Sequence, residues 1–365
     1  MTTSIRIWAY LARRHVAGIA IGLAVISALV LAGNFVEFWR RAVARDIGDL
    51  GLVGGMSLLH FPFLIEHFLP AIVLIGAMLS YRHLGRHGEL VAVRATGISW
   101  LHLVLPGIAI AAAIGAGWLF VGNPVSAAMQ TRLDSLEASH FGRDTGRLTL
   151  LGSGFWIRET GPAGETIVHA RTIDPATMRL ADVVVFRFGR GDHLDEWINA
   201  DTALLDGRGN WNLRNGVVVD REREVRPVTT YSIASTLDRH AINEGFMPAG
   251  MIPLWKLPQY VATLEQFGFS SRVHAMQFHT LLSLPVTLIS MMLLGAAFMV
   301  PSLGRSAPWL RYSGTLLGGV LFYAVRDFCR SYGETTDIPV ALAAWLPALL
   351  PAVFGVAAIL HHEDG

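Results

Sequence analysis

The chain has 365 residues, of which 52% are hydrophobic and only 16% are charged, and its mean hydropathy is +0.45. Roughly a quarter of the residues of a soluble protein are charged, so this composition indicates a membrane protein. The formal net charge of +1 gives no sign of a nucleic-acid partner, and the single cysteine, Cys329, excludes an intrachain disulfide.

Long apolar segments occur at both ends of the chain. A bilayer core of about 30 Å needs about 20 helical residues, and six segments approach or exceed that length. The sequence therefore predicts six transmembrane helices. They cover residues 16–36, 58–81, 101–125, 278–303, 312–325 and 338–360. The fifth is short and reaches back to residue 309 only across Arg311.

Arginines in the short loops indicate the orientation of these helices. With both termini in the cytoplasm, eight arginines fall on the inner side and five on the outer side. The first apolar run is too long for a signal peptide, so it is predicted to be an uncleaved helix. The outer arginines reduce the excess of arginine on the cytoplasmic side, so each of them needs its own explanation.

A mixed segment, residues 81–100, joins the second and third predicted spans on the inner side. It reads YRHLGRHGELVAVRATGISW, and the stretch from Glu89 to Thr96 consists mostly of good helix formers before Gly97. Leu90 and Val93 give this short helix more apolar surface than a solvated loop requires. The segment is either a connector lying on lipid headgroups or, as we favour, a docking helix for a cytoplasmic partner.

About 150 residues between the third and fourth spans differ sharply in composition. Short runs such as VVVFRF, WINADTALL and WNLRNGVVV partly alternate in polarity, as half-buried strands do, and glycine, proline, aspartate and asparagine separate them. Such a pattern predicts an all-β sandwich or barrel on the outer side. A helix is predicted to precede it from Pro124, and an amphipathic helix around Leu257 and Leu264 to follow it.

The loop sequence RHGELVAVRATGISWLHLVLP resembles the cytoplasmic loop of the lipopolysaccharide-export permease family LptF/LptG. Glu89-Leu90, Ala95-Thr96-Gly97 and Pro106 match its Glu-Leu, Ala-Ser/Thr-Gly and proline positions, and the six-helix layout with a β insertion also matches. The stretch NFVEFWRRA after the first span is more similar to the LptG branch.

The resemblance implies a fold and a set of partners. It implies helices 1–3 in residues 1–122 with a coupling helix at 82–100, a periplasmic β-jellyroll-like domain in 123–272, and helices 4–6 in 273–365. It also implies a homologous permease subunit (LptF if this chain is LptG-like), a dimeric cytoplasmic ATPase (LptB) and a periplasmic LptC-like bridge protein. The coupling residues would be Arg86, Glu89, Leu90, Val91, Arg94, Ala95 and Gly97.

A permease of this family would move lipopolysaccharide out of the bacterial inner membrane. The chain has one lysine, Lys256, which does not lie in a Gly-Lys-Ser/Thr motif, so it would bind no cofactor itself and ATP would be used by the partner. We find no catalytic motif. A membrane enzyme or a scaffold acting on envelope lipids through the β domain stays open as an alternative.

A lipopolysaccharide site should join an apolar cavity to cations at the outer surface, where the planar guanidinium group suits phosphate. The candidate cations could equally be interface anchors, and the candidate aromatics could be packing residues. The predicted substrate-binding residues are Asn34, Phe35, Phe38, Arg40, Arg41, Phe63, Phe68, Arg132, Phe322, Arg326 and Arg330. At the position of Asn34, members of the family that the chain resembles often have a basic residue, so this chain departs from the family pattern there.

Two further groups of polar residues have open interpretations. Glu66 and His67 lie within the second predicted span, where ionisable groups are either functional or hydrogen-bonded to a neighbouring helix. His83 and His87 are spaced for one helix face, but no third ligand is evident from the sequence, so no metal site is predicted.

Overall fold

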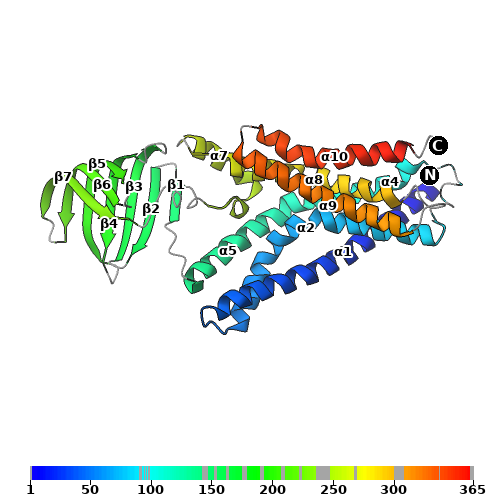
Figure 1. The fold of residues 1–365 in the computed structure, drawn as a ribbon, viewed down its shortest axis with the longest axis horizontal. Helices are drawn as coiled ribbons and strands as arrows, with labels where there is room; N and C mark the ends of the chain where they lie inside the picture. Colours follow the sequence, from blue (N-terminus) through cyan, green and yellow to red (C-terminus); the bar gives the residue numbers. More distant parts are fainter. Residues whose placement is uncertain are drawn as a thin grey trace. The chain divides into compact units, whose positions relative to one another are not determined.

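The fold is described from a computed structural model (Figure 1). It describes residues 2–89, 93, 95, 97, 99–141, 147–151, 154–161, 164–174, 179–189, 193–206, 210–221, 224–235, 247–266, 269–299, 308–336 and 338–361. The chain forms two compact units: one comprises Met1–Leu133, Pro253–Trp255 and Arg272–Gly365, and the other Asp134–Ile252 and Lys256–Ser271. The first boundary thus lies inside a helix, eleven residues beyond residue 122.

The first unit is helical. Its helices are α1 (Thr2–Val43), α2 (Leu50–Arg86), α4 (Trp100–Gly117), the π-helical turn η1 (Trp118–Gly122), the start of α5 (Asn123–Phe141), α8 (Arg272–Met299), α9 (Pro308–Thr335) and α10 (Val340–His361). The start of α1 and the end of α10 lie at the same end of this unit (Figure 1).

Five helices among the described residues are long and apolar enough to cross a membrane. They cover Arg6–Val43, Leu50–Arg86, Trp100–Glu137, Arg272–Met299 and Val340–His361. The predicted fifth span does form a helix, α9, of 28 residues. It is less apolar than the others because it carries Arg311, Arg326, Asp327, Arg330 and Glu334.

Capping residues set where two of these helices begin. Asp49 precedes α2, and its Oδ1 accepts hydrogen bonds from the backbone N–H groups of Gly51 at 2.8 Å and Leu52 at 3.2 Å. Ser99 precedes α4, and its hydroxyl accepts from the N–H of His102 at 3.3 Å. Both residues satisfy N–H groups that a helix start leaves without an intrahelical partner.

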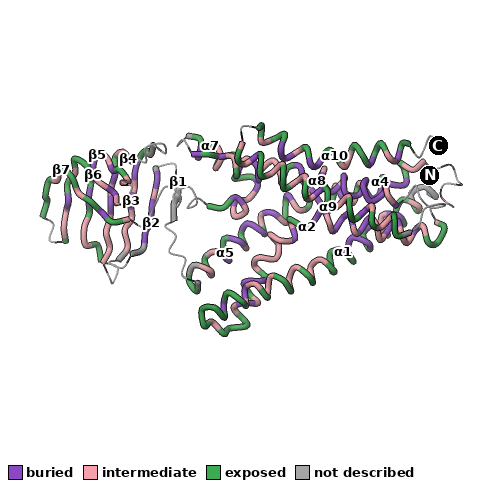
Figure 2. Tube along the Cα trace, viewed as in Figure 1, coloured by how far each residue is buried: buried purple, intermediate pink, exposed green. Residues whose placement is uncertain are grey.

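Helix α8 is the centre of the helical unit and packs against α2, α4, α9 and α10. Leu288, Met291 and Met292 on α8 are fully buried. By contrast, exposed positions recur along α1 and α10 (Figure 2), where many side chains are large and apolar. Such faces suit contact with lipid rather than water.

Glycines allow α1 and α2 to cross closely. A Cβ atom placed on Gly76 would lie 2.7 Å from the Cα atom of Ile19 and 2.8 Å from its backbone nitrogen. Small residues at helix crossings in membranes let backbones approach and gain van der Waals contact.

We expect Gly76→Leu to separate α1 from α2, because the added side chain would overlap backbone atoms that cannot move without disturbing a helix. The thermal stability of the protein in detergent should fall by several degrees or more. Gly54→Leu in the same helix is the matched control, because nothing lies within 4 Å of a Cβ atom placed there. Equal stability of the two variants would show that the crossing is not tight.

The second unit is built on an antiparallel β-sheet of seven described strands. They are β1 (Arg147–Leu151), β2 (Gly154–Gly161), β3 (Gly164–Asp174), β4 (Arg179–Phe188), β5 (Leu194–Leu205), β6 (Asn210–Asp220) and β7 (Val225–Ala234). Their order in the sheet is their order in the chain. The prediction of an inserted β domain is therefore confirmed.

The strand order differs from that of a jellyroll. A jellyroll has two sheets linked by Greek-key connections, whereas the described strands form one sheet in which each pairs with its sequence neighbour. One face of this sheet forms a core that includes Phe155, Ile157 and Trp211. Helix α7 (Leu257–Gln266) contributes to that core through Leu264, with Tyr260 packed beside it, as its predicted amphipathic face requires.

A polar cluster lies near this core. Arg187 and Glu196 are cross-strand partners whose side chains form an ion pair at 2.8 Å, and the Tyr231 hydroxyl donates to Glu196 at 3.0 Å. Partial burial, followed by the hydrogen bond to Glu196, raises the pKa of Tyr231. The phenol therefore stays a neutral donor at neutral pH.

Candidate functional site

The predicted cations of α1 share one carboxylate. Arg40 donates to both oxygens of Glu37 at 3.0–3.1 Å, and the Nε of Arg41 donates to its Oε1 at 2.7 Å. The two arginine side chains remain 74% and 51% exposed. Two guanidinium groups against one carboxylate leave a net positive charge that faces solvent, together with unused N–H donors.

Aromatic side chains flank this cationic end of α1. Phe35 stacks on Trp39 with a centroid distance of 6.4 Å, and the Arg41 guanidinium lies 5.8 Å from the centre of the Phe38 ring. Phe38 itself is only 3% exposed, so it packs inside the helical unit and does not present an open surface.

A histidine on α2 connects three of these helices. The His60 ring lies 6.0 Å from Phe38 of α1 and 5.5 Å from Phe63 of α2, and its Nδ1 is 3.1 Å from Oε1 of Gln130 on α5. Asn34 donates to the backbone oxygen of Ser57 at 3.1 Å. Asn34 therefore joins α1 to α2, and one of its amide donors is already used inside the protein.

Arg132 is exposed on α5, two residues beyond Gln130. Gln130 on the same helix contacts His60, which lies beside the aromatic rings of α1 and α2. Arg132 belongs to the helical unit.

The remaining predicted substrate residues gather where α2 meets α9. An Nη atom of Arg326 lies 2.6 Å from Nδ1 of His67, and its guanidinium is 4.9 Å from the centre of the Tyr323 ring. Tyr323 donates to the backbone oxygen of His67 at 2.9 Å. Phe68 packs beside His67, with ring centroids 5.4 Å apart.

Phe322, Arg326 and Arg330 line a small cavity of about 40 Å³ that α8 and α10 also border. Phe322 is 4% exposed, so packing accounts for most of its surface. The Nε of Arg330 donates to Glu334 at 2.8 Å. Four of the predicted cations thus form two groups, an α1 group of Arg40 and Arg41 and an α9 group of Arg326 and Arg330, while Arg132 lies on α5.

Glu66 is the centre of a polar network inside the helical unit. Its Oε2 accepts from the Trp118 indole at 2.8 Å and from Nδ2 of Asn123 at 3.3 Å, and its Oε1 accepts from Nε2 of Gln277 at 3.4 Å. Asn123 in turn accepts from the N–H of Leu254 at 2.9 Å. This favours the structural alternative for Glu66, a carboxylate bonded to neighbouring helices.

The predicted coupling segment is described in part. Leu90, Val91 and Arg94 lie outside the described residues. Glu89 accepts a hydrogen bond from the hydroxyl of Tyr10 on α1 at 2.9 Å, while Ala95 is helical and exposed. Gly97 has φ +81°, a conformation that favours glycine, so the predicted helix stop is confirmed.

Some important residues were not predicted. Glu37, three and four residues before Arg40 and Arg41, could have been found from its helical spacing. Tyr10, Trp118, Gln130 and Gln277 reach their partners from 52 to 211 residues away in the chain, so no local pattern signals them.

Five apolar helices, an inserted antiparallel β-sheet and arginines paired with aromatics at the helix ends define a polytopic membrane protein with a large extramembrane domain. A family model described as "Lipopolysaccharide export system permease LptF/LptG" matches residues 9–361. The chain therefore belongs to the LptF/LptG family, whose members are multi-pass inner-membrane permeases for lipopolysaccharide export.

Individual relatives agree with this assignment. The chain is 22% identical over 331 residues to the lipopolysaccharide export system permease protein LptG of Haemophilus influenzae, covering 87% of each chain. It is 21% identical over 322 residues to the protein of the same name from Escherichia coli K12, covering 86% of this chain and 87% of that one.

Proposed function

We propose that this chain is an LptG-like permease subunit that works with a homologous LptF-like subunit and a dimeric cytoplasmic ATPase of the LptB kind. In this proposal the complex extracts lipopolysaccharide from the inner membrane and passes it to an LptC-like periplasmic bridge. ATP is bound and used by the partner, and this chain binds no cofactor. The observation that carries the proposal is the exposed Arg40–Arg41–Glu37 group beside aromatics at one end of α1, in a chain of this family.

The proposed topology has six spans, with both termini in the cytoplasm and the β domain in the periplasm. The start of α1 and the end of α10 lie at the same end of the helical unit, which favours an even number of crossings (Figure 1). Helix α9 is the sixth span in this arrangement. At 28 residues it is long enough, and two of its charged residues are paired, Arg326 with His67 and Arg330 with Glu334.

Bridge binding is proposed for the edges of the sheet. Among the described strands, β1 pairs only with β2, and β7 pairs only with β6. Unpaired strand edges can add a further strand, so a similar sheet in a periplasmic partner could extend this one.

Docking of the ATPase is proposed for the coupling segment. Glu89 Oε1 is held by Tyr10, while its Oε2 is buried and has no hydrogen-bond partner among the described residues. A buried carboxylate oxygen without a donor is unfavourable, so docking that shifts the segment and supplies a donor would relieve that cost.

The test of the whole proposal is reconstitution of the three kinds of subunit in proteoliposomes loaded with lipopolysaccharide. We expect release of lipopolysaccharide to a soluble bridge protein that requires both ATP and this chain. Chemical modification of the lipid by the isolated chain would instead support the alternative of a membrane enzyme.

We expect Glu89→Ala to weaken association with the ATPase several-fold while leaving the membrane helices intact, because a charged contact at the docking surface is lost. Affinity in detergent and thermal stability of the chain are the two measurements. Tyr10→Phe is the control, since it removes only the internal donor to Glu89 and keeps the carboxylate. ATPase affinity of Glu89→Ala at the parent level would contradict the docking role.

A further inference from the structure

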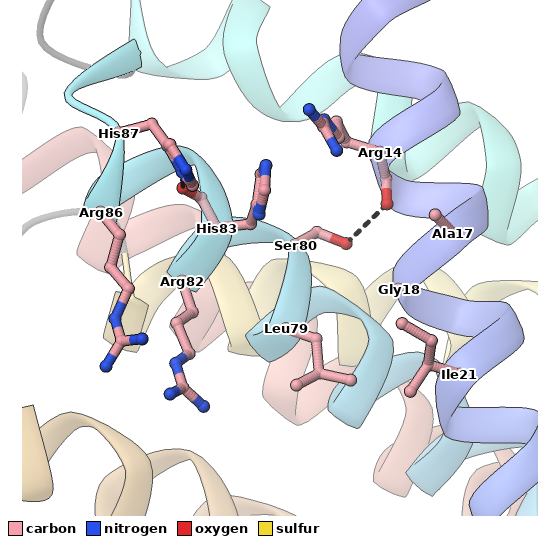
Figure 3. A pocket seen from close by; sticks show the side chains of 10 residues that line it. All are labelled: Arg14, Ala17, Gly18, Ile21, Leu79, Ser80, Arg82, His83, Arg86 and His87. Atoms are coloured by element: carbon pink, nitrogen blue, oxygen red, sulfur yellow. Dashed lines mark hydrogen bonds between the residues drawn. The ribbon is translucent and has the colours of Figure 1, made fainter.

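A second cationic cavity lies between the start of α1 and the end of α2. Its volume is about 320 Å³. Arg14 lines it from α1, and Arg82, His83, Arg86 and His87 line it from α2 (Figure 3). Among the described residues that line it, none is an aspartate or glutamate. The Arg82 and Arg86 guanidinium groups extend to one side of the hollow and that of Arg14 to the other (Figure 3). The positive charge on both sides of the hollow favours an anion.

The remaining wall of the cavity is mainly apolar. Ala17, Gly18 and Ile21 of α1 and Leu79 of α2 form it. Ile21 is 55% exposed, and the exposed Val25 continues the apolar strip one turn further along α1. A cationic rim that continues into exposed apolar helix surface matches the two parts of a phospholipid, a phosphate headgroup and an acyl chain.

Hydrogen bonds hold the two helices together at this place. The Ser80 hydroxyl donates to the backbone oxygen of Arg14 at 3.1 Å (Figure 3). The side chains of Arg82 and Arg86 extend toward the same side in Figure 3, and the Arg82 guanidinium lies 5.5 Å from the centre of the Tyr312 ring. The cavity is thus bordered by two helices that a hydrogen bond joins, with both α2 arginines at its edge.

The cavity is distinct from the α1 group at Arg40. Arg14 and Arg40 are 26 residues apart in one helix, which at 1.5 Å per residue is about 39 Å. A bilayer including its headgroups is about 40–45 Å thick, so the two cationic groups fall at opposite interfaces.

We propose that this cavity binds the phosphate headgroup of an anionic phospholipid from the leaflet at the N-terminal end of α1. The acyl chains lie along the strip that contains Ile21 and Val25. Arg14 donates to Tyr10 at 2.9 Å, and Tyr10 donates to Glu89, so the bound lipid adjoins the proposed ATPase-docking segment. The placement beside that segment rests on the proposed function, whereas lipid binding itself does not.

A metal ion is the competing ligand for the two histidines. Ligand atoms of His83, His87 and Glu89 all lie within 4.8 Å of one another, so the structure supplies the third ligand that the sequence did not reveal. Nδ1 of His87 is 2.8 Å from the backbone oxygen of His83. The arginines of the same cavity repel a divalent cation, and for this reason we favour the anion.

The test measures phosphatidylglycerol retained by the full-length chain after exchange into phosphatidylcholine nanodiscs, by native mass spectrometry. We expect Arg82→Gln with Arg86→Gln to lower retention about tenfold, since charge-assisted contacts to phosphate are lost. Arg6→Gln with Arg13→Gln removes the same charge at the same end of α1, outside the cavity lining, and is expected to retain lipid. Equal losses in both pairs would overturn the proposal, because they would show diffuse attraction only.

Single variants keep the test decisive if a double variant does not fold. Arg14→Gln should lower retention more than Arg13→Gln, its exposed neighbour outside the cavity. Added inorganic phosphate should not displace the lipid, and a chelator should leave retention unchanged. Full displacement by millimolar phosphate would assign the cavity to a soluble anion, and loss of binding with chelator would assign it to a metal; either result overturns the proposal.

Discussion

Replacing Glu66 by leucine is expected to lower the free energy of unfolding of the protein by about 2 kcal/mol or more. The change leaves the Trp118 indole and the amides of Asn123 and Gln277 without their acceptor. Each unsatisfied buried donor costs about 1–3 kcal/mol, although hydrogen bonds between membrane helices average nearer 0.6 kcal/mol because alternative partners exist. Unfolding of the purified protein in detergent, followed by tryptophan fluorescence, would measure the loss.

Glu66→Gln is the matched control for this prediction. Glutamine keeps one oxygen that can accept from Trp118 and Asn123, so most of the stability should return. If the leucine variant is as stable as the parent, the network does not hold α2 to its neighbours. If glutamine is as damaging as leucine, the negative charge and not the acceptor oxygens is what matters.

The apolar helices were predictable because a helix needs a run of about 20 apolar residues to cross the bilayer core, and such runs are visible in the sequence. Five predicted spans coincide with helices that are apolar enough to cross. Their ends were not predicted, since α1 continues to Val43, well past residue 36. Beyond the apolar run, helix formation depends on local propensity and on the stop near Asp46, whose φ of +56° ends the helical conformation.

For the β domain, the alternation of side chains was visible but the strand order was not. Period-two patterning shows which residues of β5 face the core, and Ile198 and Ala200 are indeed buried there. Pairing is a long-range property that turn lengths and packing decide together. The jellyroll expectation came from resemblance, and the described strands form a sequential meander instead.

The candidate site was predictable by residue type more than by arrangement. The sequence placed arginines beside aromatics near the ends of α1 and α9, and the structure pairs Arg41 with Phe38 and Arg326 with Tyr323. It could not show that Phe322 is packed inside the protein. The distinction between a cavity-lining aromatic and a core aromatic depends on neighbouring helices, which a single sequence does not locate.

Charge reversal of Arg40 and Arg41 to glutamate is expected to reduce crosslinking of lipopolysaccharide to the chain, and its export, by more than tenfold. The double alanine variant should lose several-fold. Alanine removes an attraction that solvent already weakens at these exposed side chains. Glutamate adds repulsion to a phosphorylated headgroup, and with Glu37 it places three carboxylates within about one helical turn.

Changing Glu37 tests the same group of residues in the opposite direction, by making its net charge more positive. In the parent its carboxylate occupies donors of both arginines, so a phosphate must compete with it. Glu37→Gln raises the local net charge by one unit and releases part of those donors. We therefore expect this variant to load lipopolysaccharide at least as well as the parent, at low salt especially, with normal membrane insertion and normal ATPase docking. If the arginines were only interface anchors, the alanine, glutamate and Glu37→Gln variants would all load lipid as the parent does, and the headgroup site would have to lie with Arg326 and Arg330 on α9.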